Sequence, residues 1–456
     1  MLTLRTREER AEAGRALRRS APRSAHATWA APASRPDPVA LVLAQEAGRI
    51  AELLPRRHTL MAASPLAFLR GAASVMASDL AATPSAGPRV QACGDCHLMN
   101  FGAFSSPEGE ALFDINDFDE TLPAPFEWDV KRLAASLVLA GREAGLGATG
   151  SGAIARAAVR AYAGELEGLA ALDPLACRAR RIDLAGAVAA VRGHGARRDA
   201  EASLRRAVEA GATQYGLLER DGAGWRLRGD VATMFRLPRH DGAVHAAFEA
   251  YRRTLQEDRR VLLGRYRLAD WAFKVVGVGS VGTFCAVGLF LSGDGEPLLL
   301  QIKQASASVL APFAGASEYA AQGERVVTGQ RMMQAASDVF LGWARMPAAA
   351  SKAAGPEHVY VRRLKDARLA AVGARIAARS LASYAVLCGR TLARAHARSG
   401  DAAMLSGYCG GAGFSRAVAG FAQAYADQAT QDWRAFTDAI AAGRVSHEPA
   451  GTEGAG

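Results

Sequence analysis

One stretch of this chain departs from the pattern of the rest, and it sets the class of fold. Residues 271–305 are rich in glycine, β-branched and aromatic residues, with a turn at Gly293–Gly295 between two apolar runs. Such a segment favours antiparallel strands. The flanking regions, such as 127–146 and 378–443, instead repeat apolar residues at helical spacing. We therefore expect an α+β protein with a helix-rich large lobe and a small antiparallel β lobe.

The succession of these patterns predicts five parts. They are an Arg-rich N-terminal extension (1–55), the first half of the helical lobe (56–262), a small β-rich lobe (263–366), C-terminal helices that complete the helical lobe (367–445) and a disordered tail (446–456).

The charge and hydropathy of the sequence limit which partners and which cellular compartment we expect. The net charge is +10, but the arginines are scattered along Ala-rich segments without the interleaved aromatic residues of a nucleic-acid site, so we interpret them as solvated surface. The N-terminus lacks the apolar core of a secretory signal, and charges or glycines interrupt every long apolar run. We expect a cytoplasmic protein with no nucleic-acid or membrane partner.

The segment Cys-Gly-Asp-Cys-His at 93–97 admits two interpretations. Two cysteines followed by a histidine are typical of c-type haem attachment, and Cys93 with Cys96 would also suit zinc. Haem c is attached outside the cytoplasm, and a zinc site needs a second ligand pair that the sequence does not supply. We therefore expect no haem, and favour the second interpretation, in which Asp95 and Asn100 carry the chemistry.

Asp95, Asn100 and Asp117 form the set of side chains that phosphoryl transfer needs. A carboxylate orients the acceptor hydroxyl, while an amide and a second carboxylate hold Mg²⁺ against the phosphates. Asp117 ends the second strand of a hairpin expected around the Ser-Ser-Pro-Glu-Gly turn at 105–109, which would bring it near the loop. The alternative is that these are ordinary turn residues.

A second set of residues suited to phosphate binding comes much later in the chain. A glycine-rich turn lets backbone N–H groups approach phosphates, and a lysine on a neighbouring strand contacts the α- and β-phosphates. The glycine-rich turn at 277–282 is not a Walker loop, since no Gly-Lys-Ser/Thr closes it. It is also not a dinucleotide fingerprint, since an apolar strand follows it. A glycine turn without a ligand is the alternative. The residues of this set are Gly277, Gly279, Ser280, Gly282 and Lys303.

Together these segments resemble the catalytic half of aminoglycoside phosphotransferase and choline kinase-like enzymes. The matching stretches are Gly94-Asp-x-His97-x-x-Asn100, Asp117-Phe-Asp119 and Trp128-Asp129-x-x-Arg-Leu-Ala. The resemblance implies ATP and Mg²⁺ as cofactors. It also implies Asp95 as the catalytic base, Asn100 and Asp117 as Mg²⁺ ligands, Asp129 as an anchor of the catalytic loop, and Lys303 with the Gly277–Gly282 turn as a clamp on ATP.

The order of the segments differs from that of ordinary kinases, in which the glycine loop and lysine come first. The resemblance therefore implies a circularly permuted protein kinase-like (aminoglycoside phosphotransferase-like) fold, which is physically acceptable where the termini are close at the surface. Cys93 stands where those enzymes have histidine. The sequence does not decide which acidic residue pairs with Lys303. Glu318 and Glu324, on the following helix, are the candidates.

Along nearly its whole length the chain also resembles the bacterial family called domain of unknown function 2252. The stretches that carry this resemblance include SPLAFLRGAA, CGDCHLMNFG, VVGVGSVGT and LARAHARSGD. The family name implies no activity.

We expect an ATP- and Mg²⁺-dependent phosphotransferase that acts on a hydroxyl of an unidentified small molecule. The alternatives are a non-catalytic nucleotide-binding pseudokinase with a regulatory role, and transfer of AMP to a protein. Arg70 would reach a phosphate or pair with an Asp such as Asp119, whereas His396 and Asp401 would line the site or cap a helix.

Overall fold

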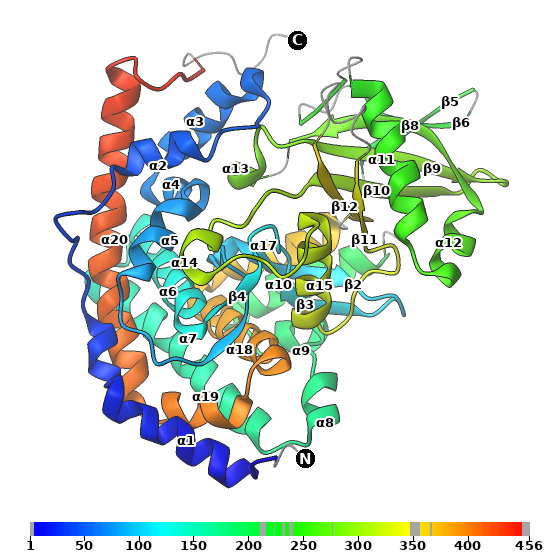
Figure 1. The fold of residues 1–456 in the computed structure, drawn as a ribbon. Helices are drawn as coiled ribbons and strands as arrows, with labels where there is room; N and C mark the ends of the chain where they lie inside the picture. The colour runs from blue at the N-terminus through cyan, green and yellow to red at the C-terminus, as the bar shows by residue number, and fades with distance from the viewer. Residues whose placement is uncertain are drawn as a thin grey trace.

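The computed structural model describes residues 4–209, 216–222, 224–229, 233–236, 240–275, 277–346, 356–364 and 367–448. Within these residues the chain is a mixed α+β protein, which confirms the α+β class predicted from the sequence. A helical part lies beside a small antiparallel sheet (Figure 1).

The helical part is built around α6, which is buried on nearly every side. Its buried residues include Ala134, Leu137 and Val138, and small or apolar side chains all round are expected of a central helix. Helix α7 packs closely against α6, α18 and α20, and α20 also packs against α6. The helices of this part are α6 (Phe126–Glu143), α7 (Gly147–Ala170), α8 (Pro174–Ala179), α9 (Leu184–Ala189), α10 (His194–Glu209), α17 (Ala367–Arg379), α18 (Leu381–Ser399), α19 (Ala402–Cys409) and α20 (Ala412–Ala441).

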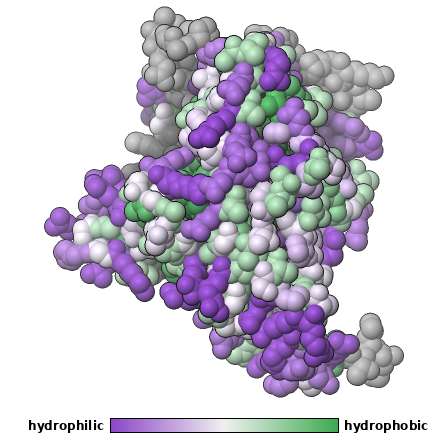
Figure 2. Space-filling view, turned by 90° about the vertical axis from the view of Figure 1, so that its left-hand side faces the viewer, coloured by the Kyte–Doolittle hydropathy of each residue, from purple (hydrophilic) through white to green (hydrophobic). Residues whose placement is uncertain are grey.

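The N-terminal segment runs along the outside of the helical part. Helix α1 (Arg7–Ser20) begins with a capping box between Thr6 and Glu9 and packs against α19. Figure 2 views the molecule from the side on which α20 lies, and hydrophilic residues gather at the lower end of that face. The short helices that follow are η1 (Arg23–Ala27), α2 (Pro38–Ala44), η2 (Ala51–Leu53), α3 (Leu54–Ala62), α4 (Pro65–Gly71) and α5 (Ala73–Ala81).

Two short antiparallel pairs lie between α5 and α6 in the chain. Strands β2 (Phe101–Ser105) and β3 (Ala111–Ile115) form the predicted hairpin, with Phe101 opposite Ile115. Strand β1 (Arg89–Ala92) pairs with β4 (Leu122–Pro125). The loop from β1 to the short helix η3 (Leu98–Asn100) and the segment after β3 therefore emerge close together.

In the part of the chain that the structure describes, the small sheet has six antiparallel strands in the order β11-β12-β10-β9-β8-β7. Helix α15 (Gln322–Met333) separates β10 from β11 in the chain and packs on β11 and β12. The strands are β7 (Met234–Phe235), β8 (Tyr266–Lys274), β9 (Cys285–Ser292), β10 (Pro297–Gln304), β11 (Gly342–Arg345) and β12 (His358–Arg363), with the short helices α13 (Gly277–Ser280) and α14 (Ala311–Ala314) between them.

The two faces of the small sheet have different partners. Leu300 and Ile302 belong to an apolar cluster that includes Phe248 and Tyr251 of α11 (Asp241–Thr254). On the opposite face, Leu299 contributes to a cluster with the hairpin of β5 (Leu218–Asp221) and β6 (Gly224–Leu227). Because side chains alternate along a strand, Gln301 and Lys303 share the face of Leu299.

The described part of residues 217–262 packs on this sheet, although its mainly helical sequence pattern predicted a place in the helical half. Strand β7 is a member of the sheet, and α11 with α12 (Glu257–Leu263) contributes to the apolar cluster on one face. Helical periodicity shows which side of a helix is apolar, but not which neighbour covers it. None of the helices in the described ranges has the length and apolar character needed to cross a bilayer.

Candidate active site

Segments that lie far apart in the chain meet around one cavity of about 280 Å³. Its wall combines the loop before β2, the segment after β3, the turn before β9 and the strands β10 and β12. The residues predicted from the sequence that line this cavity are Arg70, Asp95, His97, Asn100, Asp117, Gly279, Ser280 and Lys303. The tertiary structure thus brings residues of both predicted sets to one place, although Gly277 and Gly282 are not among the described residues that line the cavity.

The loop that carries Asp95 and Asn100 is closed by its own hydrogen bonds. Asn100 Nδ2 donates to the carbonyl oxygen of Asp95 at 2.6 Å, and His97 N donates to the same oxygen at 2.8 Å. Gly94 has φ +83°, and a Cβ there would lie 2.4 Å from Glu120 O, so the turn requires glycine. Since the amide nitrogen of Asn100 is used inside the loop, Oδ1 is the end of this side chain that suits a cation.

Asp95 is held in place by a buried arginine that the sequence reasoning left without a role. Arg132 Nε of α6 donates to Asp95 Oδ1 at 2.7 Å, and Arg132 Nη2 donates to Leu69 O at 2.9 Å. His97 Nε2 lies 3.7 Å from the other carboxylate oxygen. Burial lowers the pKa of His97 to about 4, so the imidazole is neutral at neutral pH. The signal available in the sequence was a charged side chain directly before the apolar run Leu133–Ala135.

Asp129 anchors the loop, as the resemblance implied. Its carboxylate accepts hydrogen bonds from Cys93 N at 2.6 Å and Gly94 N at 3.0 Å. His396 does not line the cavity; its Nε2 lies 3.1 Å from Asp129 Oδ2, and its Nδ1 lies 2.9 Å from Tyr162 Oη. His396 therefore acts on the loop through Asp129.

Asp401 lies at a helix end rather than at the cavity. Its carboxylate accepts from Ala403 N and Met404 N at the start of α19, and Arg10 pairs with it at 2.9 Å. Of the two roles that the sequence allowed for Asp401, helix capping is the one that the geometry supports.

Lys303 pairs with the two carboxylates of the segment after β3. Its Nζ lies 2.6 Å from Asp119 Oδ2 and 4.0 Å from Asp117 Oδ1. Tyr360, opposite Lys303 in the β10–β12 register, donates to Asp119 Oδ1 at 2.5 Å. Burial disfavours the charged amine, but Asp117 and Asp119 outweigh it and hold the pKa of Lys303 well above its usual value.

Two of the pairings considered from the sequence differ from those in the structure. The partners of Lys303 are Asp119 and Asp117, not Glu324 or Glu318, because the strand points its lysine toward the helical part of the molecule. The Asp119 carboxylate is therefore occupied by Lys303 and Tyr360, and Arg70 does not pair with it. Arg70 lines the cavity instead, and its buried Nε has no hydrogen-bond partner among the described residues.

The glycine-rich turn contains a single turn of helix, α13, where an open turn between strands was expected. Gly277–Ser280 are helical, Gly282 has φ +85°, and β9 begins at Cys285. Arg49 donates to Gly279 O at 3.0 Å and to Val281 O at 2.6 Å, so a cation satisfies carbonyl groups that the end of a helix leaves without partners. The N-terminal segment thus supports this wall of the cavity.

Comparison with protein families gives one match that covers most of the chain. The family model described as "Uncharacterized protein conserved in bacteria (DUF2252)" matches residues 49–439. The chain belongs to this family. Comparisons with curated proteins and with solved structures gave no match. All the cavity residues named above fall inside the DUF2252 match, whose description states no activity.

The DUF2252 cavity has donors that suit Mg²⁺. Asn100 and Asp117 present an amide and a carboxylate to the same space, and Mg²⁺ is commonly held by one or two carboxylates together with the phosphates of a substrate. No group of three or more His, Cys, Asp or Glu side chains in the described ranges is placed to hold a metal without such a substrate. Asn100 and Asp117 are therefore suitable donors for an Mg²⁺ ion whose remaining ligands come from water or a phosphate group.

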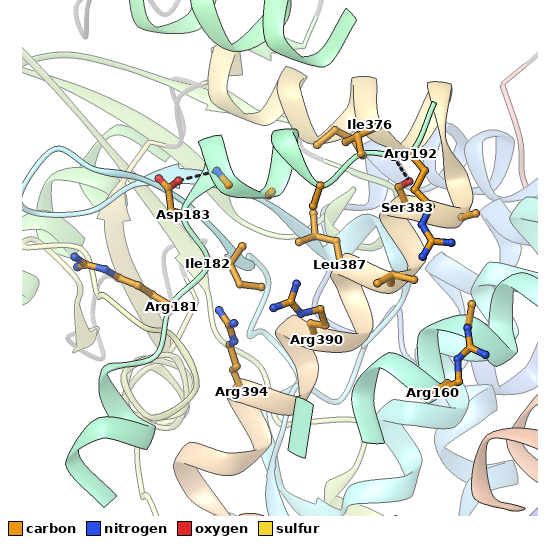
Figure 3. Close-up of a pocket in the computed structure, with 17 residues that line it drawn as sticks. Arg160, Arg181, Ile182, Asp183, Arg192, Ile376, Ser383, Leu387, Arg390 and Arg394 are labelled. Atoms are coloured by element: carbon orange, nitrogen blue, oxygen red, sulfur yellow. Dashed lines mark hydrogen bonds between the residues drawn. The ribbon is translucent and has the colours of Figure 1, made fainter. Parts of the chain in front are cut away.

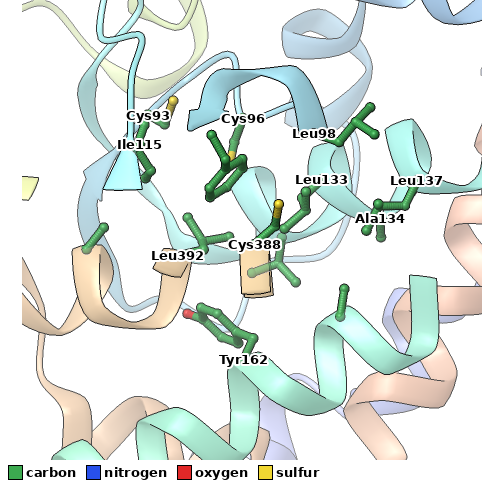
Figure 4. Close-up of a cluster of buried hydrophobic side chains, with 14 of the residues drawn as sticks. Cys93, Cys96, Leu98, Ile115, Leu133, Ala134, Leu137, Tyr162, Cys388 and Leu392 are labelled. Carbon is green, nitrogen blue, oxygen red and sulfur yellow. The ribbon is translucent and has the colours of Figure 1, made fainter. Parts of the chain in front are cut away.

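The two cysteines of the DUF2252 loop are packing residues in this structure. Cys93 Sγ donates to Asp117 O at 3.2 Å, which links the loop to the segment after β3. Cys96 lies in a buried cluster with Leu133 and Cys388 (Figure 4). Burial raises the pKa of the Cys96 thiol well above its usual value, whereas a metal ligand would be a thiolate.

Proposed function

We propose that this protein is an ATP- and Mg²⁺-dependent phosphotransferase that phosphorylates a hydroxyl group of a small molecule. One observation carries the proposal: Asp95, Asn100, Asp117, Lys303 and the glycine-rich turn, which come from distant parts of the chain, line the same cavity. Phosphoryl transfer depends mainly on positioning and charge neutralisation, and these are the groups that supply both.

We interpret the fold as protein kinase-like with a circular permutation. The small lobe supports this in its order of elements: the glycine-rich turn between β8 and β9, the lysine on β10, then α15, β11 and β12. This is the order in which kinases place the glycine loop, the lysine strand and the helix that follows it. The loop bearing Asp95 and the segment bearing Asp117 come before these elements instead of after them.

The contact between the end of α18 and the start of β1 supports the same interpretation. Ser399, the last residue of α18, accepts a hydrogen bond from Gln91 N of β1 at 2.9 Å through its hydroxyl. A short connection there would restore the order of an ordinary kinase, in which a helix leads into the catalytic loop. Permutation between chain segments that already touch requires little change in the fold.

The residues of the cavity would then divide the work as follows. Asp95, oriented by Arg132, receives the proton of the acceptor hydroxyl. Asn100 and Asp117 hold Mg²⁺, which neutralises charge on the phosphates. Lys303 adds a positive charge on the nucleotide side, and the backbone of the glycine-rich turn approaches the phosphates.

Binding of Mg·ATP tests the proposal. We expect ATP with Mg²⁺ to raise the melting temperature of the wild type, and ATP without Mg²⁺ to raise it less. Asp117→Ala should abolish the Mg²⁺-dependent part, whereas Asp294→Ala, in the exposed turn between β9 and β10, should keep it. The absence of any Mg·ATP effect on the wild type would refute the proposal.

Labelled nucleotides identify the group that is transferred. With a mixture of small hydroxyl compounds as acceptors, label from the γ-phosphate of ATP should enter a small product. Incorporation of label from the α-phosphate into protein would instead indicate AMP transfer. Nucleotide binding without transfer of either label would indicate a regulatory pseudokinase.

A further inference from the structure

A second cavity lies on the side of the helical part, away from the residues just described. It has a volume of about 380 Å³ and is bounded by α7, the segment 181–192 and the helices α17 and α18 (Figure 3). It shares no lining residue with the candidate active site. Its volume is within the range of roughly 300–1,000 Å³ that is usual for small-molecule sites.

The floor of this cavity is apolar. Leu387 of α18 and Ile376 of α17 are buried, as is Val191, while Ile182 is partly exposed beside them. In Figure 3 Leu387 and Ile182 lie among the labelled arginines. An apolar surface of this kind favours the hydrocarbon part of a ligand.

The walls of the cavity are cationic. Among the described residues, five arginines line it, and Asp183 is the one acidic residue that does so. The Asp183 carboxylate already accepts from Gly186 N at 2.7 Å, as the N-cap of α9. The arginines are Arg160, Arg181, Arg192, Arg390 and Arg394.

Arg394 has a buried hydrogen-bond donor that a ligand would satisfy. Arg394 Nε and Arg390 Nε both donate to the single carboxylate of Glu165, at 2.7 and 2.9 Å. The side chain of Arg394 is only 8% exposed, and its Nη1 is buried without a hydrogen-bond partner among the described residues. A buried donor left unpaired is costly, and a second anion beside Arg390 and Arg394 would satisfy it.

We propose that this cavity binds an amphipathic organic anion, with a carboxylate or phosphate monoester group on Arg390 and Arg394 and an apolar chain on the floor around Leu387. Guanidinium groups match both kinds of oxyanion through paired hydrogen bonds. Arg160 and Arg192 add positive charge at the exposed edge of the cavity. This site does not depend on the function proposed for the first cavity.

Calorimetric titration of the full chain, without nucleotide or Mg²⁺, tests the proposal. The probes are octanoate, monooctyl phosphate and the neutral 1-octanol. We expect one or both anions to bind at least tenfold more tightly than octanol, and the stronger of the two identifies the head group. Shortening the chain of that anion from eight to four carbons should weaken binding by roughly two- to fourfold per methylene. Equal binding of octanol, or no binding of either anion, would overturn the proposal.

Variants locate the probe. Arg394→Met should weaken anion binding at least tenfold, whereas Arg416→Met, on the exposed side of α20, should leave it unchanged. Because Arg394→Met leaves Glu165 with one partner fewer, Arg192→Met at the exposed edge serves as a second variant, and we expect it to weaken binding severalfold. Wild-type affinity in a folded Arg394→Met protein, or in Arg192→Met if the first does not fold, would overturn the proposal.

Discussion

His396 Nε2 lies 3.1 Å from Asp129 Oδ2, and this contact joins α18, late in the chain, to the helix that follows the candidate catalytic loop. Asp129 in turn accepts hydrogen bonds from the backbone of Cys93 and Gly94. Because a carboxylate only accepts, His396 donates from Nε2, and its Nδ1 accepts from the hydroxyl of Tyr162. A C-terminal helix thus fixes the position of a loop near the N-terminal end.

Replacing His396 should therefore impair turnover more than nucleotide binding. We expect His396→Ala to lower kcat by roughly ten- to a hundredfold, because a small displacement of Asp95 misplaces the base, while KM for ATP changes little. Steady-state kinetics separate the two effects. Asp401→Ala is the matched control: it removes the N-cap of α19, should cost about 1 kcal/mol of stability, and should leave kcat unchanged. An equal fall in kcat in both folded variants would contradict a positioning role for His396.

Asp95→Asn should separate chemistry from binding. Loss of a general base typically costs a factor of about 10² to 10⁴ in rate, and we expect that loss in kcat with the Mg·ATP-dependent thermal stabilisation preserved. The variant also leaves Arg132 with an amide in place of its carboxylate partner, so its melting temperature has to be measured alongside. A folded variant with turnover within a few fold of the wild type would rule out Asp95 as the base.

The ion pair of Lys303 and Asp119 should appear as energetic coupling. Lys303 is 2% exposed and Asp119 is 30% exposed at the side chain, so we expect a coupling free energy of about 1–3 kcal/mol in a double-mutant cycle of Lys303→Met and Asp119→Asn, measured by urea unfolding. The same cycle with Glu324→Gln in place of Asp119→Asn should give additive effects. Coupling to Glu324 but not to Asp119 would contradict the pairing in the structure.

The stability of the protein should fall as the pH drops below the ordinary pKa of histidine. Burial lowers the pKa of His97 from 6.5 to about 4, so between these two values the unfolded chain binds a proton that the folded chain does not. The free energy of unfolding therefore rises with pH across this window. On acidification through the same window, the contribution of His97 to that free energy falls by on the order of 3 kcal/mol. Urea unfolding between pH 7 and 4 should show a smaller loss for His97→Gln, and an unchanged loss for His447→Gln, at an exposed position.

The sequence by itself determined the local elements and the chemically important side chains. The hairpin of β2 and β3, the strand of Lys303 and the α+β class follow from periodicity and turn residues, which act over a few neighbouring positions. The spacing of Asp95, Asn100 and Asp117 predicted a set that the structure gathers around one cavity.

Tertiary structure alone decided which distant groups face one another. Lys303 pairs with Asp119 instead of Glu324, Arg132 holds Asp95, and His396 reaches the loop through Asp129. Local spacing fixes neighbours within one helix or strand, but an ion pair between separate elements depends on how those elements pack and on which face each side chain leaves. That information is present only once the helices and the sheet have come together.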